Sequence, residues 1–258
     1  MGMRRPPVEV HTPDVVFSLN HLPTWFGLAF SAGAVNAAAF LATQRFVSHV
    51  TGSVTTTGMR AASQLVAEAL VVFLAFIVGA AVSVVPLEGR RQKGLPPRFH
   101  APLMIEVMVL AAVALLGTLG LFGLFGATET AASVVVLVLL AFAMGLQNAT
   151  AASTTKGLVR TTHLTGTATD LGVNVGTIFV ANGEVRTGAL KGAAFRAGKV
   201  LSFAVGAATM VPLSWWFGWF VFVVPAIIVA LCAASSFEPF SPPSADDVTG
   251  PPRPARSS

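Results

Sequence analysis

The sequence predicts an all-α membrane protein, a polytopic helix bundle of about six spans made from two copies of one unit. Composition is the first observation, because the 258 residues are 54% hydrophobic and only 10% charged, whereas soluble domains carry about 25% charged residues. Apolar runs are the second, since a helix needs about 20 apolar residues to cross a bilayer. An internal repeat is the third, and it implies two structurally related halves.

The repeat is clearest in two polar stretches, 33–58 and 145–172. Their shared positions are Gly33 with Gly145, Asn36 with Asn148, His49 with His163, and Thr51-Gly52 with Thr165-Gly166. The similarity continues into an F-x-x-G-A motif at 76–80 and again at 203–207. We therefore expect repeat one to cover 24–126 and repeat two to cover 131–236.

Six apolar segments are predicted to span the membrane. They are residues 25–43, 65–85, 102–125, 131–152, 200–213 and 217–234. Residues 1–21 are predicted to be a polar cytoplasmic arm. Residues 237–258 are rich in Pro and Ser and cannot bury apolar surface, so we expect a disordered tail. The membrane domain is then 22–236.

Two further segments, 45–64 and 156–182, are too polar to face lipid. Each contains Thr-Gly among other hydroxyl residues and glycines, which permits a broken or re-entrant helix. Irregular backbone is tolerated at membrane depth only where protein buries it or where it lines a cavity. Both T-G segments are therefore predicted to be re-entrant.

The positive charges predict the orientation. With six spans, fourteen of the sixteen lysines and arginines fall on one side, and only Arg45 and Arg60 fall on the other. Basic residues favour cytoplasmic loops, so both termini and the basic loops 86–101 and 183–199 are expected in the cytoplasm. If only the second T-G segment spanned, this bias would weaken, and if both spanned there would be eight crossings. Because the repeats start three spans apart, they have opposite orientations.

Inverted repeats with broken polar segments are typical of secondary transporters, whose substrates bind near the midplane at half-helix N-termini. The free N–H groups there favour an anion or another small polar solute. The candidate substrate-binding residues are Asn36, Thr51, Gly52, Asn148, Thr165 and Gly166. The alternatives are that the glycines allow close helix packing and that the asparagines form interhelical hydrogen bonds.

Asp170, His49 and His163 are the candidates for ion or proton coupling. Asp170 lies in the second T-G segment, and a charge at membrane depth needs a role. It could instead stabilise a helix dipole, and each histidine could orient its own turn. Glu68 and Glu106 lie near the ends of predicted spans, where we expect them to reach headgroups or water.

Enzyme motifs are missing from the sequence, which contains no H-E-x-x-H, G-x-S-x-G or P-loop pattern. One cysteine and five scattered histidines predict no metal site. We expect no enzyme activity, no cofactor and no nucleic-acid partner. The protein is predicted to be a small-solute transporter or permease. Its predicted partners are membrane lipids and an unknown small solute, and an oligomer is compatible with the sequence. The alternative is a non-transporting scaffold that binds partner proteins.

The motifs G-A-V-N at 33–36, H-V-T-G at 49–52, G-L-Q-N-A at 145–149 and R-T-T-H-L-T-G-T at 160–167 resemble the bacterial YoaK-like family. The resemblance covers roughly residues 24–236, although Ser53 stands where that family commonly has Asn. It implies a multi-pass protein of the bacterial inner membrane. The family is uncharacterised, so the resemblance implies no activity.

Overall fold

The computed structural model describes most of the predicted membrane domain. The described residues are 21–47, 52, 55, 64–93, 99–127 and 131–236. Within them all regular structure is helical, as predicted. The predicted arm before residue 21, the predicted tail and most of the first T-G segment lie outside the described residues.

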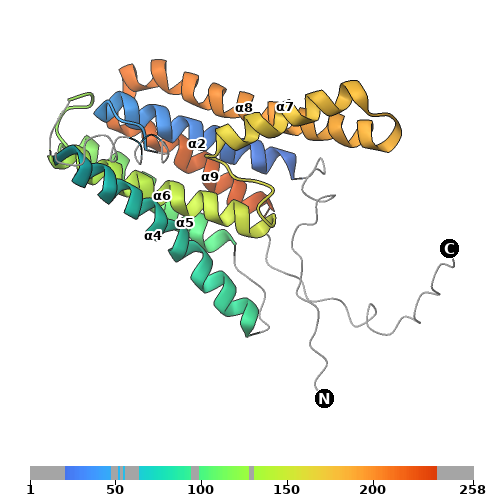
Figure 1. Cartoon of the computed structure of the whole chain (residues 1–258). Helices are drawn as coiled ribbons and strands as arrows, with labels where there is room; N and C mark the ends of the chain where they lie inside the picture. The colour runs from blue at the N-terminus through green and yellow to red at the C-terminus, as the bar shows by residue number, and fades with distance from the viewer. Residues whose placement is uncertain are drawn as a thin grey trace.

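The helices form an elongated bundle (Figure 1). They are α2 (Leu22–Thr43), α4 (Gln64–Gln92), α5 (His100–Thr118), α6 (Ala131–Thr154), α7 (Leu164–Val180), α8 (Gly183–Phe217), the short 3-10 helix η1 (Gly218–Phe222) and α9 (Val223–Ser236). Five stretches among the described residues are long and apolar enough to cross a membrane. The last, Gly183–Ser235, folds back at Gly218, whose φ is 50°. The described residues therefore make six long helical passes, in agreement with the predicted helix bundle.

The closest approach of α2 and α8 occurs at a glycine on each helix. A Cβ at Gly33 would lie 2.0 Å from the carbonyl oxygen of Phe203, and a Cβ at Gly206 would lie 2.1 Å from that of Phe30. Glycines on these faces let the two backbones touch, as small residues do in membrane bundles. Because Phe26 also packs near the earlier part of α8, at Gly198, the two helices run in the same direction.

The same crossing recurs between α4 and α6. A Cβ at Gly79 would lie 2.1 Å from the carbonyl oxygen of Phe142, and a Cβ at Gly145 would lie 2.1 Å from that of Phe76. Each of the four helices thus carries an F-x-x-G motif at its crossing point. Each crossing joins one helix from each copy, so the two copies make equivalent contacts with each other.

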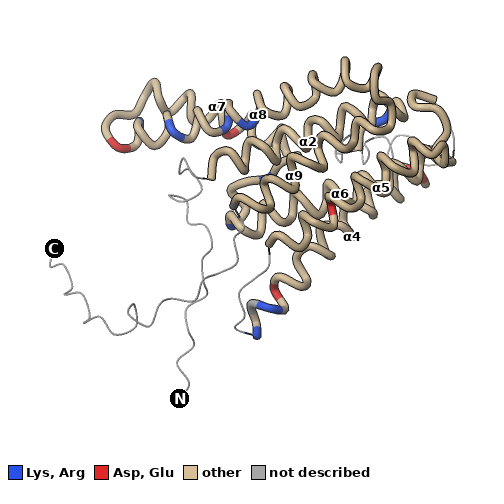
Figure 2. The backbone as a smooth tube through the Cα atoms, turned by 180° about the vertical axis from the view of Figure 1, so that it is seen from behind, with Lys and Arg blue, Asp and Glu red and all other residues tan. Residues whose placement is uncertain are grey.

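A helical hairpin projects from one end of the bundle (Figures 1 and 2). It consists of α7 and the first part of α8, and the only buried residue of α7 is Thr167. Residues 183–199 are therefore helical, and the prediction of a basic loop there was wrong. The buried positions of this segment are Ala189, Gly192, Phe195 and Lys199. Their spacing of three and four residues is that of an amphipathic helix, and the basic residues between them concealed the pattern.

Two other boundaries differ from the predicted spans. α4 continues through Pro86 to Gln92, beyond the predicted end at residue 85. α5 ends at Thr118, whereas the span was predicted to continue to residue 125. Three glycines follow with positive φ, namely Gly120, Gly123 and Gly126. Positive φ is incompatible with a right-handed helix and is easily adopted by glycine, so the apolar run ends in turns.

Candidate functional site

Glu106 is a carboxyl group inside the bundle. Its exposure is 0%, and neither carboxylate oxygen has a hydrogen-bond partner in the described part of the chain. It lies on α5 between Leu103 and Leu110, both also fully buried. These residues share one face of the helix, so this face is turned inward. The expectation that Glu106 reaches headgroups or water was therefore wrong.

Gln147 is a second buried polar side chain, on α6. Its Nε2 donates a hydrogen bond to the carbonyl oxygen of Leu28 on α2 over 2.8 Å. Its Oε1 is buried and has no partner among the described residues. Gln147 thus ties one copy to the other and leaves one acceptor unused.

Cys232 brings a thiol from α9 towards Glu106. The sulfur is 3.7 Å from the carbonyl oxygen of Thr24, to which the thiol donates. The absence of a side chain at Gly27 makes room for it, since a Cβ there would lie 2.6 Å from Sγ. Cys232 also belongs to the same buried cluster as Leu103, which lies one turn before Glu106 on α5.

We call Glu106, Gln147 and Cys232, with the carbonyl groups of Thr24 and Leu28, the polar layer. α2 begins at the end of the bundle where α6 and α9 finish, because Thr24 meets Cys232 and Leu28 meets Gln147. α5 begins at the same end, since Phe99 and Leu103 belong to one buried cluster with Trp25 and Leu28. At 1.5 Å per residue, all these groups lie roughly 3–10 Å from that end. An apolar cluster closes the layer on that side, and its members include Trp25, Phe99, Val159 and Phe195.

Asn36 and Asn148 occupy equivalent places in the two copies. Asn36 Oδ1 accepts a hydrogen bond from the backbone N–H of Val47 over 3.2 Å, and Asn148 Oδ1 accepts one from Thr162 over 3.3 Å. Each asparagine therefore holds the connector that follows its own helix. Asn148 lies beside Gln147, whereas Asn36 lies about 12 Å further along the bundle, counting from Leu28. The structure does not bring the two asparagines together.

The second T-G turn begins a continuous helix. Thr165 is exposed in the first turn of α7, and a Cβ on Gly166 would meet the ring of His163, 2.7 Å from Nδ1. In the first copy, Gly52 is helical and half-buried. His49 and Thr51 lie outside the described residues, so the meeting of the two turns stays a prediction.

Asp170 lies on the hairpin, away from the polar layer. Its side chain is 59% exposed and forms an ion pair with Arg196, with 3.4 Å between Oδ2 and Nε. It joins α7 to α8 and is not in the first turn of α7. Lys199 makes a second link at this place, because its buried Nζ donates to the carbonyl oxygen of Arg160 over 2.6 Å.

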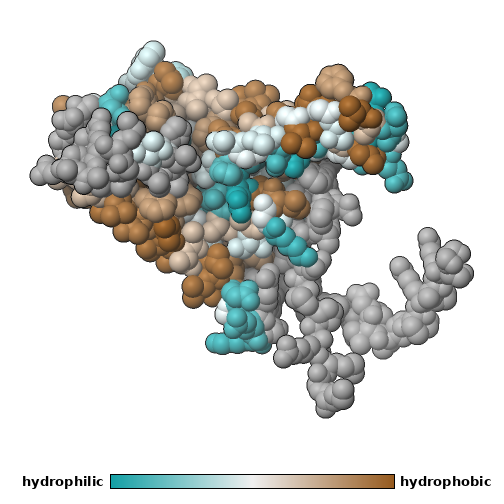
Figure 3. Space-filling view, in the orientation of Figure 1, coloured by the Kyte–Doolittle hydropathy of each residue, from teal (hydrophilic) through white to brown (hydrophobic). Residues whose placement is uncertain are grey.

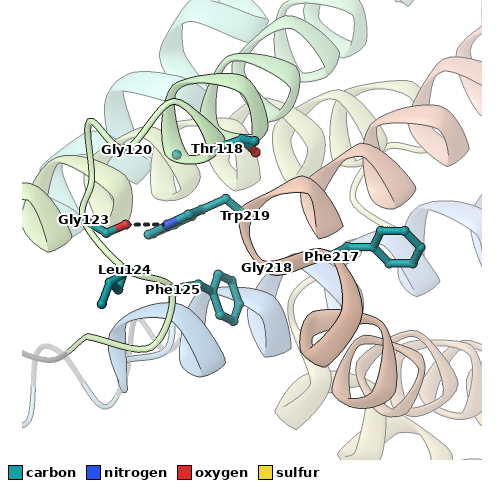
Figure 4. Close-up of a pocket in the computed structure, with 9 residues that line it drawn as sticks. Thr118, Gly120, Gly123, Leu124, Phe125, Phe217, Gly218 and Trp219 are labelled. Carbon is teal, nitrogen blue, oxygen red and sulfur yellow. Dashed lines mark hydrogen bonds between the residues drawn. The ribbon is translucent and has the colours of Figure 1, made fainter.

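A separate pocket lies at the opposite end of the bundle (Figure 4). Its volume is about 400 Å³. It is lined by Gly117, Thr118, Gly120, Gly123, Leu124, Phe125, Phe217, Gly218 and Trp219. The indole Nε1 of Trp219 donates to the carbonyl oxygen of Gly123 over 2.9 Å. The lining carries no ionisable side chain, so the pocket offers an apolar shape and little chemistry.

The hydrogen bond between Asn148 and the backbone N–H of Thr162 leads to a testable prediction. Asn148→Ala removes the acceptor for the Thr162 N–H, and we expect faster hydrogen exchange at the Thr162 amide and a loss of about 1 kcal/mol in unfolding free energy. Asn148→Asp keeps an oxygen acceptor and serves as the control. Exchange at Thr162 that is unchanged in the alanine variant would mean that this hydrogen bond does not hold the connector.

The described residues contain no group of three His, Cys, Asp or Glu side chains that could hold a metal ion. A search of curated proteins found no match, and neither did a search of solved structures. A family described as "Protein of unknown function (DUF1275)" matches residues 24–235, which is most of the chain and nearly the whole of the bundle. The chain therefore belongs to the DUF1275 family.

Proposed function

We propose that this protein transports a small polar solute across the membrane and has no catalytic activity. The observation that carries the proposal is Glu106, an acid buried in the bundle with no partner among the described residues. Acids in membrane spans are costly, and they commonly mark substrate or ion pathways. A packing role at this position would be filled by leucine, as at Leu103 and Leu110 one turn away on either side.

The arrangement of the two copies supports this proposal. α2 and α6 are equivalent helices that run in opposite directions, as are α5 and α9, which is the relation expected of inverted-topology repeats (Figure 1). The α2–α8 and α4–α6 pairs are joined by backbone contacts, while α2 and α6 touch less extensively. Each pair can then move as one body. Rocking of two such bodies around a fixed site is how inverted-repeat transporters alternate access.

The charge distribution supports a cytoplasmic location for the end that carries the hairpin. Figure 2 shows lysines and arginines gathered on the hairpin and at the end of α4. We place this end in the cytoplasm of a bacterial inner membrane, by the positive-inside rule. Because α2 begins and α9 finishes at this end, we also place both termini on the cytoplasmic side. Membership in the YoaK-like group is consistent with the family match.

The hairpin favours the second candidate, a scaffold that binds partner proteins. Phe179, Val180 and Val185 are exposed near its turn, with Phe179 at 83%. Figure 3 shows brown, apolar atoms beside teal, polar atoms at this tip. Apolar groups beyond the end of a bundle would be covered by a partner or a second copy in such a protein.

Reconstitution in liposomes tests transport. Vesicles with purified protein would be incubated with a mixture of amino acids, organic amines and carboxylic acids, and their contents identified by mass spectrometry. We expect at least one solute to accumulate relative to protein-free vesicles and Glu106→Gln to lose most of this uptake. Asp170→Asn, which changes an exposed acid, is the matched control and should keep it. Uptake that is equal in the two variants, or absent in the folded wild type, would contradict the transport proposal. The scaffold function would then be favoured.

A further inference from the structure

We infer that the polar layer binds one small monovalent cation, with Glu106 as its only charged ligand. The inference deepens the proposed function and rests on it, because it names the chemistry of the occupant of the same site. The shared chemistry is a single positive charge that meets oxygen acceptors. A proton and an alkali-metal ion both have this chemistry, and the experiment below separates them.

The unused polar atoms of the layer are all acceptors. They are Oε1 and Oε2 of Glu106 and Oε1 of Gln147. The donors are already engaged, since the Gln147 amide donates to Leu28 and the Cys232 thiol donates to Thr24. An occupant must therefore bring hydrogen-bond donors or positive charge, and an anion would meet only repulsion here.

The protein does not supply this charge from its described residues. Among the described residues, Glu106 forms no ion pair with a Lys, Arg or His, and neither of its carboxylate oxygens has a hydrogen-bond partner. The other groups of the layer are Cys232 from α9, the neutral Gln147 from α6 and carbonyl groups from α2. Lys199 and Arg196 point elsewhere, to the Arg160 carbonyl and to Asp170. An ionised carboxylate without a partner is very costly in an apolar interior.

A site with a single carboxylate favours a monovalent cation over a divalent one. A monovalent ion neutralises Glu106, whereas Ca²⁺ or Mg²⁺ would leave a buried positive charge and usually requires several oxygen ligands, including more carboxylates. No group of three candidate metal ligands occurs in the described residues. The apolar cluster around Trp25 and Phe99 separates the layer from water at the nearer end of the bundle.

Thermal unfolding of the purified full-length protein in detergent tests the inference. The midpoint would be measured in NaCl, KCl and choline chloride at equal ionic strength, and at a series of pH values. An alkali ion that binds only the folded state raises the midpoint with its concentration. A proton on Glu106 gives stability at low pH that is lost as pH rises, because the ionised form has no partner in the folded state.

Chemical modification of Cys232 detects cation binding within the polar layer itself. It is the only cysteine in the sequence, and its thiol donates to the Thr24 carbonyl oxygen of the layer, so its rate of alkylation by N-ethylmaleimide reports on the layer. We expect the ion that raises the midpoint to slow this alkylation in the wild type. Both effects should be lost in Glu106→Gln, which keeps the size of the side chain, and kept in Asp170→Asn.

The outcomes are distinct. A midpoint that rises in NaCl or KCl and not in choline assigns an alkali-metal ion. Indifference to these salts with a pH dependence that Glu106→Gln removes assigns a proton. No dependence on either, or a dependence that persists in Glu106→Gln, overturns the inference. Because no transport is measured, cation binding without solute uptake would fail the proposed function alone, and uptake without cation dependence would fail this inference alone.

Discussion

Gly206→Ala is expected to destabilise the protein by about 3 kcal/mol, the cost of overpacking a tight site. The new Cβ would lie 2.1 Å from the carbonyl oxygen of Phe30, and that atom belongs to the backbone of α2, which cannot rotate away. The α2–α8 pair must therefore move apart. Denaturation in detergent micelles would measure the loss.

Gly188→Ala on the same helix is the matched control. A Cβ at Gly188 meets nothing within 4 Å, so alanine there should be neutral or stabilise the helix by up to about 1 kcal/mol. The second crossing offers the same comparison on α4, with Gly79→Ala against Gly89→Ala. Equal stability of the crossing and control variants would show that the helices do not meet at these glycines.

Trp219→Ala is expected to cost about 3 kcal/mol or more, as large aromatic truncations do. The indole is largely buried, and its ring packs near Phe122, Phe125 and Phe222 at centroid distances of 5.6, 5.3 and 6.3 Å. Its hydrogen bond to Gly123 also fixes the turns that end α5. Thermal unfolding would report the loss.

Trp216→Ala is the control for this residue. Trp216 lies three positions earlier and is 83% exposed, so its removal should change the unfolding midpoint little. A midpoint lowered equally by both substitutions would mean that Trp219 acts as a membrane-surface anchor and not through the aromatic cluster.

The helix class and the repeat could be predicted because composition and spacing are properties of the chain itself. The F-x-x-G-A motifs at 76–80 and 203–207 were visible as a repeat. Their partners at Phe30 and Phe142 could not be predicted, because pairing between distant helices depends on packing. The sequence shows which helices have a small-residue face and does not show which faces meet.

Glu106 and Asp170 show why the candidate site could not be predicted from the sequence. α5 is apolar on all sides, with Met104 and Met108 exposed and Leu103 and Leu110 buried, so no periodic pattern indicated which face Glu106 shares. Asp170 was favoured because it lies in the second T-G segment, yet this segment is on the projecting hairpin and the acid faces Arg196. Asn36 and Asn148 each accept a hydrogen bond from their own connector, and these bonds follow from backbone geometry that residue spacing does not reveal.

The glycine crossings also have a consequence for how the chain matures. α2 is synthesised early, but the helix against which its bare backbone face rests, α8, comes late in the chain. Until α8 is inserted, that face of α2 is covered by lipid. The corresponding face of α4 likewise has no helix partner until α6 is inserted. Neither half can complete its packing alone, since each lacks a partner that the other provides. Assembly is therefore a late step that follows insertion and depends on contacts between distant parts of the chain. A stalled or truncated chain would leave glycine-lined faces open to mispairing within the membrane.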